Sequence, residues 1–86
     1  MQGTRVESIG DLWGEDGVDG GYCPVTSEDG RSWMVRTPNG HLGNLGNHEV
    51  VEHEDGTITV SPSILVSDPS GELWHGYLEG GVWRPC

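Results

Sequence analysis

The 86-residue chain has a formal net charge of −10, with four arginines, no lysine, fifteen glycines, and neither alanine nor phenylalanine. This length allows one domain with one modest core. Four scattered arginines do not make the basic patch that direct binding to nucleic-acid phosphates requires, and the lack of alanine and lysine disfavours helices. We therefore expect an all-β, turn-rich single domain in which any helix is a single turn.

The apolar runs are short, and the longest covers only residues 64–66. Such a run is too short for a membrane span or for the core of a signal peptide, so a cytoplasmic protein without membrane contact is expected. Cys23 and Cys86 are the only cysteines. In a reducing compartment they are expected to be free thiols or metal ligands rather than a disulfide.

Residues 1–21 are expected to form an acidic, glycine-rich arm, and residues 22–86 a compact β domain. The arm opens with a strand predicted over residues 4–9. Its carboxylates repel one another and its many glycines make the backbone flexible, so we expect the arm to be loosely attached. Leu12 and Trp13 are its apolar exception, and we expect Trp13 to dock it on the core. The acidic residues of the arm are Glu7, Asp11, Glu15, Asp16 and Asp19.

The first half of the compact domain contains one well-defined hairpin. A turn is predicted at Asp29-Gly30, and the next strand, over residues 31–37, alternates with Trp33 and Val35 on one face. Pro38-Asn39-Gly40 ends this strand. Residues 41–47, HLGNLGN, are rich in asparagine and glycine and are predicted to form a compact loop.

Five further short strands are predicted in the second half, over residues 48–53, 57–60, 64–66, 72–79 and 82–84. Turns at Asp55-Gly56, at residues 68–71 and at Gly80-Gly81 separate them, and Pro62 predicts a bend, bulge or sheet edge because it has no N–H group. Within residues 72–79, Trp74 and Leu78 should share a face. These spacings predict an antiparallel meander of five to seven strands that forms a small barrel or sandwich.

The segments EHEDGTITVSPSI and WHGYLEGGVW, with MVRTPNG upstream, resemble a family of small uncharacterised proteins of actinobacterial phages and prophages. The resemblance covers roughly residues 33–86. It implies a phage protein acting in the host cytoplasm or in the virion, and it implies no activity. A more distant likeness is to a domain of unknown function whose Cys-Pro element and extra cysteines suggest zinc; this chain has Cys23-Pro24 of that element.

Zinc is therefore one alternative, with Cys23, His75 and Cys86 as the candidate ligands. Structural zinc takes four nitrogen or sulfur ligands, commonly in pairs a few residues apart. The two cysteines here are isolated in sequence, and His48 and His53 should point to opposite faces of a strand. Ordinary histidines and free thiols are the alternative interpretation. The acidic arm also lacks the ligand spacing of a calcium loop.

Catalytic motifs are absent from the sequence. His75 with Ser61 or Ser63 and a carboxylate supplies the components of a nucleophilic site, but no nucleophile-elbow motif accompanies them. Glycines are plentiful, yet no helix start comes after them to form a phosphate-binding loop. We therefore expect a protein that is not an enzyme, with no catalytic or cofactor-binding residues.

Binding through the surface is the remaining interpretation. Tryptophans outside a core commonly anchor interfaces, and carboxylates steer basic partners toward them. The first hypothesis is a phage accessory protein that binds a host or defence protein. In this hypothesis its acidic surface imitates the negative charge of nucleic acid. The second is a virion component, such as a capsid decoration or a minor tail or head subunit, laced to a neighbour by the arm and able to self-associate. The candidate partner-binding residues are Trp13, Glu15, Asp16, Asp19, Glu52, Glu54, Asp55 and Trp83.

Overall fold

The computed structural model describes residues 1–28, 30–46 and 48–86, and the predicted all-β class is confirmed. The predicted turn residue Asp29 and the loop residue Asn47 lie outside the described residues. One short 3-10 helix, η1 (Ile9–Leu12), accompanies the strands. The strands of the described residues are β1 (Thr4–Arg5), β2 (Gly21–Ser27), β3 (Gly30–Arg36), β4 (Leu42–Asn44), β5 (Glu49–Glu52), β6 (Ile58–Ser61), β7 (Ile64–Asp68), β8 (Gly71–Glu79) and β9 (Val82–Pro85).

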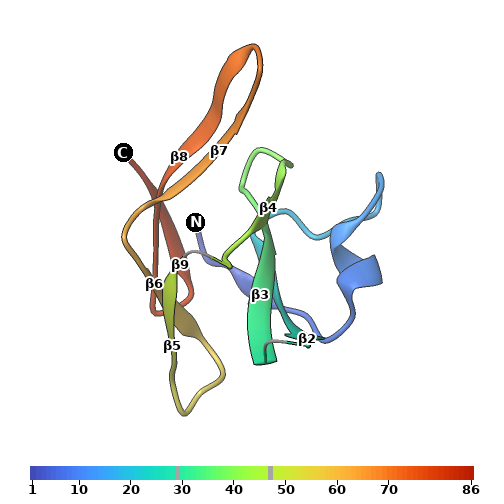
Figure 1. Ribbon diagram of the computed structural model, residues 1–86, viewed down its shortest axis with the longest axis vertical. Helices are drawn as coiled ribbons and strands as arrows, with labels where there is room; N and C mark the ends of the chain where they lie inside the picture. Colours follow the sequence, from blue (N-terminus) through green and yellow to red (C-terminus); the bar gives the residue numbers. More distant parts are fainter. Residues whose placement is uncertain (29, 47) are drawn as a thin grey trace.

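These strands form three small sheets, in the orders β1-β2-β3-β4, β5-β6 and β7-β8-β9. Figure 1 shows the first sheet on one side of the molecule and the other two on the opposite side, so the arrangement is a sandwich and not a closed barrel. Among the described residues, consecutive strands within each sheet pair antiparallel, as a meander requires, except that β1 pairs with β2 in parallel.

The N-terminal segment joins the two sides. Its first residues pair with β9 through bonds from the Gly3 amide to the Gly81 carbonyl (2.7 Å) and from the Trp83 amide to the Met1 carbonyl (2.8 Å). A few residues later the Val6 amide donates to the Tyr22 carbonyl of β2 at 2.9 Å. The expectation of a loosely attached arm is therefore wrong. The segment is part of the β structure because its backbone hydrogen bonds are made to both sheets.

Leu12, and not Trp13, anchors the middle of the N-terminal segment. The Leu12 side chain is 0% exposed, whereas Trp13 is 56% exposed. Ser8 caps η1, its hydroxyl accepting a bond from the Gly10 amide at 3.3 Å. The one turn of η1 directs Leu12 inward against β2 and leaves the next residue outside, which corrects the expected docking role of Trp13.

The core lies between the two sides and is built without phenylalanine. As predicted from the alternation, Trp33 and Val35 are both buried, and Leu78 is buried in the core cluster against which Trp74 packs. Gly76 lies between two backbones, and a Cβ there would meet the Trp74 ring and the Arg84 carbonyl. The buried core residues are Tyr22, Trp33, Val35, Leu45, Ile58, Val60, Ile64, Leu78 and Trp83.

Trp83 connects the two sides through its indole group. Its Nε1 donates a buried hydrogen bond of 2.7 Å to the carbonyl of Gly20, and its ring meets that of Trp74 edge-to-face at 5.2 Å between centroids. At 1% exposure Trp83 offers no surface to a partner. The prediction that it meets a partner is therefore corrected: a strand tryptophan of this β protein fills the core.

Two local predictions also differ from the structure. The segment over residues 41–47 that was predicted to be a compact loop contains strand β4. Leu42 and Asn44 of β4 pair with Arg36 and Met34 of β3. The strand predicted over residues 4–9 is limited to Thr4–Arg5, because η1 begins at Ile9. Such short pairings depend on a neighbouring strand, so alternation within one segment does not reveal them.

Two hairpin turns are closed by aspartate side chains. Asp55 Oδ1 accepts bonds from the hydroxyl (2.6 Å) and amide (3.0 Å) of Thr57, and Asp68 Oδ1 accepts the equivalent pair from Ser70 at 2.5 and 2.8 Å. These bonds, the hydroxyl bond first, lower the pKa of both carboxyls because they stabilise the charged form.

Replacing Trp83 with Phe should lower the free energy of unfolding by about 2–3 kcal/mol, since it leaves the Gly20 carbonyl buried without a donor and creates a small cavity. Urea unfolding followed by circular dichroism measures this. The matched control is Trp13→Phe, which should change stability by less than about 0.5 kcal/mol because Trp13 is exposed. Equal effects of the two substitutions would contradict this role of Trp83.

The two turn carboxyls should make stability depend on pH in the acid range. Because their pKa values are lowered on folding, their contribution is complete above the unfolded value near about 4 and is lost as pH falls through the folded values. The double variant Asp55→Asn, Asp68→Asn keeps an acceptor oxygen in each turn but no longer titrates. Its unfolding free energy should fall less steeply below about pH 4 than that of the wild type. An unchanged slope would show that these turns do not couple to pH.

Candidate functional site

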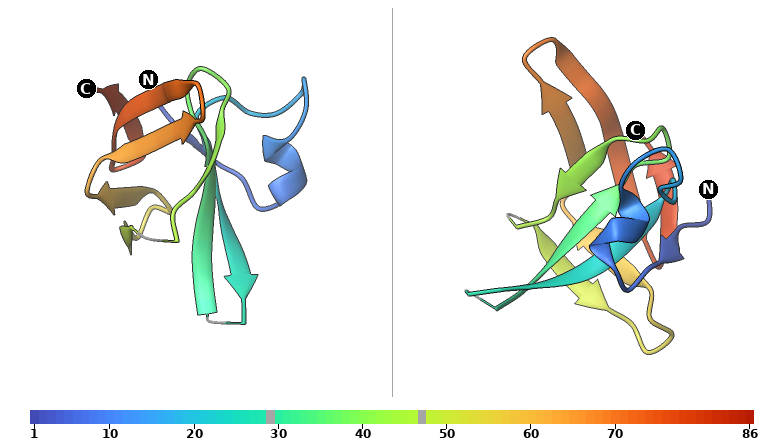
Figure 2. Two further views of the ribbon diagram at one scale, coloured as in Figure 1. Left: turned by 45° about the horizontal axis from the view of Figure 1, so that its top comes forward. Right: turned by 90° about the vertical axis from the view of Figure 1, so that its right-hand side faces the viewer.

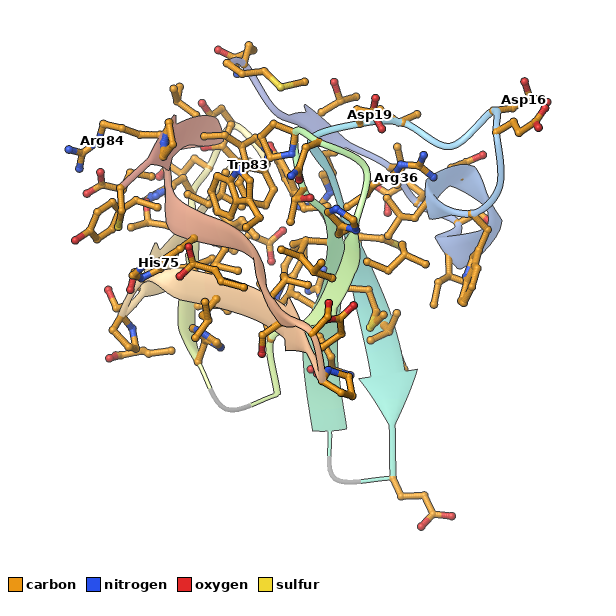
Figure 3. The ribbon with its side chains drawn as sticks, turned by 90° about the horizontal axis from the view of Figure 1, so that it is seen from above. Asp16, Asp19, Arg36, His75, Trp83 and Arg84 are labelled. Carbon is orange, nitrogen blue, oxygen red and sulfur yellow. The ribbon has the colours of Figure 1, made fainter. Side chains whose placement is uncertain are left out.

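Arg36 of β3 holds the loop that comes after η1. Its Nε donates to Asp19 Oδ1 at 2.8 Å, and its Nη1 donates to the carbonyls of Leu12 (2.9 Å) and Gly14 (2.8 Å). The Arg36 side chain is only 15% exposed. Figure 3 shows Arg36 between η1 and Asp19, with Asp16 at the outer end of the loop. One arginine thus fixes both ends of an acidic loop.

That fixed loop presents a mixed apolar and acidic surface. Trp13 is 56% exposed and Ile9 is 42% exposed, although both are large apolar side chains. We call this the Trp13 surface, formed by Ile9, Asp11, Trp13, Glu15 and Asp16, all of which are exposed. An exposed aromatic on a fixed backbone, on a segment that also carries exposed carboxylates, is suited to binding a partner that has an apolar pocket with a basic rim.

Three of the predicted partner residues belong to this surface, and Asp19 does not. Trp13, Glu15 and Asp16 lie together on it. Asp19 is paired with Arg36, so its charge holds the loop in place instead of facing a partner. Sequence reasoning missed Ile9, Asp11 and Arg36 as contributors. A signal for the first two was present in Ser8-Ile9-Gly10-Asp11, a helix-capping pattern that starts a turn and orients the residues after it.

The second predicted acidic set, on the β5–β6 hairpin, mainly supports the fold. Glu52 accepts a bond from Arg5 Nη1 at 2.6 Å and pairs with Arg31 at 3.2 Å, and the Arg5 bond is the main cause of the lowered pKa of Glu52. Asp55 closes its turn, and Glu54 is exposed. Figures 1 and 2 show this hairpin well away from η1, so the two acidic sets form separate surfaces.

Arg5 is the centre of the contacts that hold the β5–β6 hairpin against the first sheet. Besides Glu52 it pairs with Glu7 at 3.0 Å and donates to the Gly56 carbonyl at 3.0 Å. Its guanidinium lies 5.3 Å from the ring centroid of Trp33, and that of Arg31 lies 5.1 Å from the same ring. Arg5 and Arg31 therefore each make both a cation–π contact and an ion pair.

All four arginines of the chain are paired within it, the remaining two being Arg36 with Asp19 and Arg84 with Glu79. Within the described part of the chain, Asp11, Glu15 and Asp16 belong to no such ion pair. The carboxylates of the Trp13 surface are consequently not neutralised by an ion pair within the described residues.

The proposed zinc ligands are not brought together. Cys86 comes directly after β9 and donates its amide to the His75 carbonyl at 3.1 Å, but Cys23 lies in β2 on the other side. Burial raises the pKa of the Cys23 thiol, which disfavours the thiolate that zinc needs. In residues 1–28, 30–46 and 48–86, no three histidine, cysteine or acidic side chains gather to hold a metal ion. The predicted zinc ligands Cys23, His75 and Cys86 therefore do not lie together in the described structure.

The part of the chain that the structure describes forms no pocket, and none of its helices is long and apolar enough to cross a membrane. Comparison with protein-family models, with curated proteins and with solved structures gave no match. The resemblance to a phage family thus stays a prediction, and the Trp13 surface is interpreted from its own geometry.

Removal of the Arg36 side chain should release the loop. Arg36→Met should lower the free energy of unfolding by about 1–3 kcal/mol, mostly through the two backbone carbonyls that lose a charged donor, because the exposed Asp19 pair contributes little. Hydrogen exchange of the Gly17 and Val18 amides, which are bonded to carbonyls of this loop and of η1, should accelerate. Arg84→Met is the matched control, and equal exchange in both variants would contradict the role of Arg36.

Proposed function

We propose that this protein is a non-enzymatic, phage-encoded accessory protein that binds a basic protein of the host cytoplasm, such as a defence or nucleic-acid-binding protein, through the Trp13 surface. The observation that carries the proposal is a 56% exposed tryptophan on a loop fixed by Arg36, with three exposed carboxylates close to it in sequence that form no ion pair among the described residues. A protein with 14 acidic and 4 basic residues uses all of its arginines internally, so its outward field is negative.

The fixed backbone around Trp13 supports a role for this exposed tryptophan in binding. A tryptophan on a mobile loop loses conformational entropy on binding, whereas one held in place loses much less. Here Leu12 is buried directly before Trp13, and the Leu12 and Gly14 carbonyls on either side of Trp13 are both bonded to Arg36. The backbone on both sides of Trp13 is thus held in place before a partner binds.

Charge distribution supports a basic partner. Carboxylates at the rim of an interface accelerate association with a basic surface and discourage acidic partners. A basic partner that normally holds nucleic acid fits this chemistry, with Asp11, Glu15 and Asp16 taking the place of phosphates. Duplex DNA should then compete with this protein for the partner.

The alternative of a virion component loses its main argument. It rested on a free N-terminal arm that laces onto a neighbour, and residues 1–6 are hydrogen-bonded within their own chain to β2 and β9. A role in the virion through other surfaces of the protein would need support from a different observation.

A photo-crosslinking amino acid at position 13 tests the proposal in the host. It should capture one basic protein, while the same amino acid at the equally exposed Leu65 should not. With the captured protein purified, Trp13→Ala should weaken binding by roughly 30-fold, as expected for an interface anchor worth about 2 kcal/mol.

The charge part of the proposal has its own variant. Asp11→Asn, Glu15→Gln and Asp16→Asn together should slow association and flatten its dependence on salt, with a smaller effect on dissociation. The matched control Glu28→Gln changes an exposed carboxylate on the β2–β3 hairpin. Binding that is indifferent to both Trp13→Ala and the triple variant would refute this function.

A further inference from the structure

A serine and a histidine are brought together on the outer face of the β7–β8–β9 sheet. The Ser63 hydroxyl oxygen lies 2.9 Å from Nε2 of His75, and Nδ1 of the same imidazole lies 3.7 Å from Oε1 of Glu72. The two residues are twelve apart in sequence. Neither the Trp13 surface nor the core accounts for this arrangement.

Strand pairing explains why these side chains meet. Leu65 is paired with His75, and Ser63, two residues before Leu65, lies on the same face away from the core, so its hydroxyl reaches the imidazole diagonally. The Ser63 backbone is held from a second direction, because its carbonyl accepts from Nε2 of His48 at 3.1 Å. The amide of Cys86 in turn donates to the His75 carbonyl at 3.1 Å. The pair is therefore built on fixed backbone positions.

The chemistry of the partners assigns the proton on His75. The Glu72 carboxylate lies 3.7 Å from Nδ1, which is too far for a hydrogen bond, but its negative charge favours the tautomer with hydrogen on Nδ1. Nε2 then carries a lone pair, and the Ser63 hydroxyl is the donor to it. This is the polarity that a general base needs toward a serine nucleophile. The His75 side chain is 35% exposed and Ser63 is half-buried, so both residues have surface in contact with solvent.

We propose that Ser63 is a base-activated nucleophile that accepts an acyl group from activated esters, with His75 as its general base. In the step, Oγ of Ser63 forms a bond to the acyl carbon while its proton moves to Nε2 of His75. The bond from the acyl carbon to the leaving oxygen then breaks, and the leaving alkoxide or phenoxide takes up a proton from His75 or from water. The products are an ester on Ser63 and a free alcohol or phenol. This acylation is stoichiometric and is a modification of the protein.

The same molecule supplies internal comparisons. Ser70 also donates its hydroxyl, but to the carboxylate of Asp68, which is a far weaker base than imidazole. Thr59 lies 2.7 Å from Nε2 of His53, but its hydroxyl also accepts from the Gly80 amide and is a hindered secondary alcohol. Ser63 should therefore react faster than either of them.

Acetylation by p-nitrophenyl acetate tests the proposal, with peptide mass spectrometry locating each acetyl group. The chain contains no lysine, which leaves the N-terminal amine and the exposed Cys86 as the main competing sites. In the wild type, Ser63 should be acetylated at least roughly 100-fold faster than Ser70, the gain typical of general-base assistance. Comparable rates at Ser63 and Ser70 would overturn the proposal without any variant having to fold.

Variants then separate the roles. His75→Gln should slow acetylation of Ser63 by about 100-fold, whereas the matched change His53→Gln should leave it unaffected. Glu72 acts as a positioning residue, so Glu72→Gln should slow the reaction less and should raise the share of the Nε2-protonated tautomer of His75, read from imidazole ¹⁵N shifts. A wild-type His75 protonated mainly on Nε2, or an unaffected His75→Gln variant, would exclude His75 as the base.

Discussion

The buried hydrogen bond from the Trp83 indole to the carbonyl of Gly20 connects the two sides of this sandwich, and much of the structure depends on it. It fixes the N-terminal segment between β9 and β2, where the segment pairs with both strands. Gly3 shows how close this packing is, because a Cβ there would lie 2.9 Å from the indole nitrogen and 2.8 Å from the Gly81 carbonyl. In a chain of 86 residues, a core without phenylalanine obtains its contact area from such tryptophans.

Scarcity of positive charge is the second constraint. With four arginines available, each one holds an element in place: Arg5 and Arg31 hold the β5–β6 hairpin, Arg36 holds the loop after η1, and Arg84 pairs with Glu79 at the end of the sheet. Among the described residues, Asp11, Glu15 and Asp16 are carboxylates that form no ion pair with an arginine. The acidic character of the Trp13 surface is therefore a consequence of how the arginines are used, and it coincides with an exposed aromatic on a fixed backbone.

The two proposed sites lie on different elements and use different chemistry. The Trp13 surface depends on exposure and charge, and needs no close approach between its own side chains. The Ser63–His75 pair depends on a 2.9 Å contact that is created by the pairing of β7 with β8. The sequence offers His75 and either Ser61 or Ser63 as components of a nucleophilic site, but no catalytic motif accompanies them. Only the register of the pairing distinguishes the two serines, since it places Ser63 next to the imidazole.

Features that depend on neighbouring residues could be predicted from the amino-acid order alone. Composition predicted the all-β class, alternation predicted the buried faces of Trp33 and Val35, and turn chemistry predicted the hairpins closed by Asp55 and Asp68. Features that depend on distant partners required the folded chain. Trp13 and Trp83 are the same residue type in glycine-rich surroundings, yet one is exposed and the other is core, because β9 is paired with the N-terminal segment and η1 turns Leu12 inward. Likewise, the acidic arm is ordered because Arg36, seventeen residues beyond Asp19, bonds to its backbone, and local charge repulsion gives no indication of such a contact.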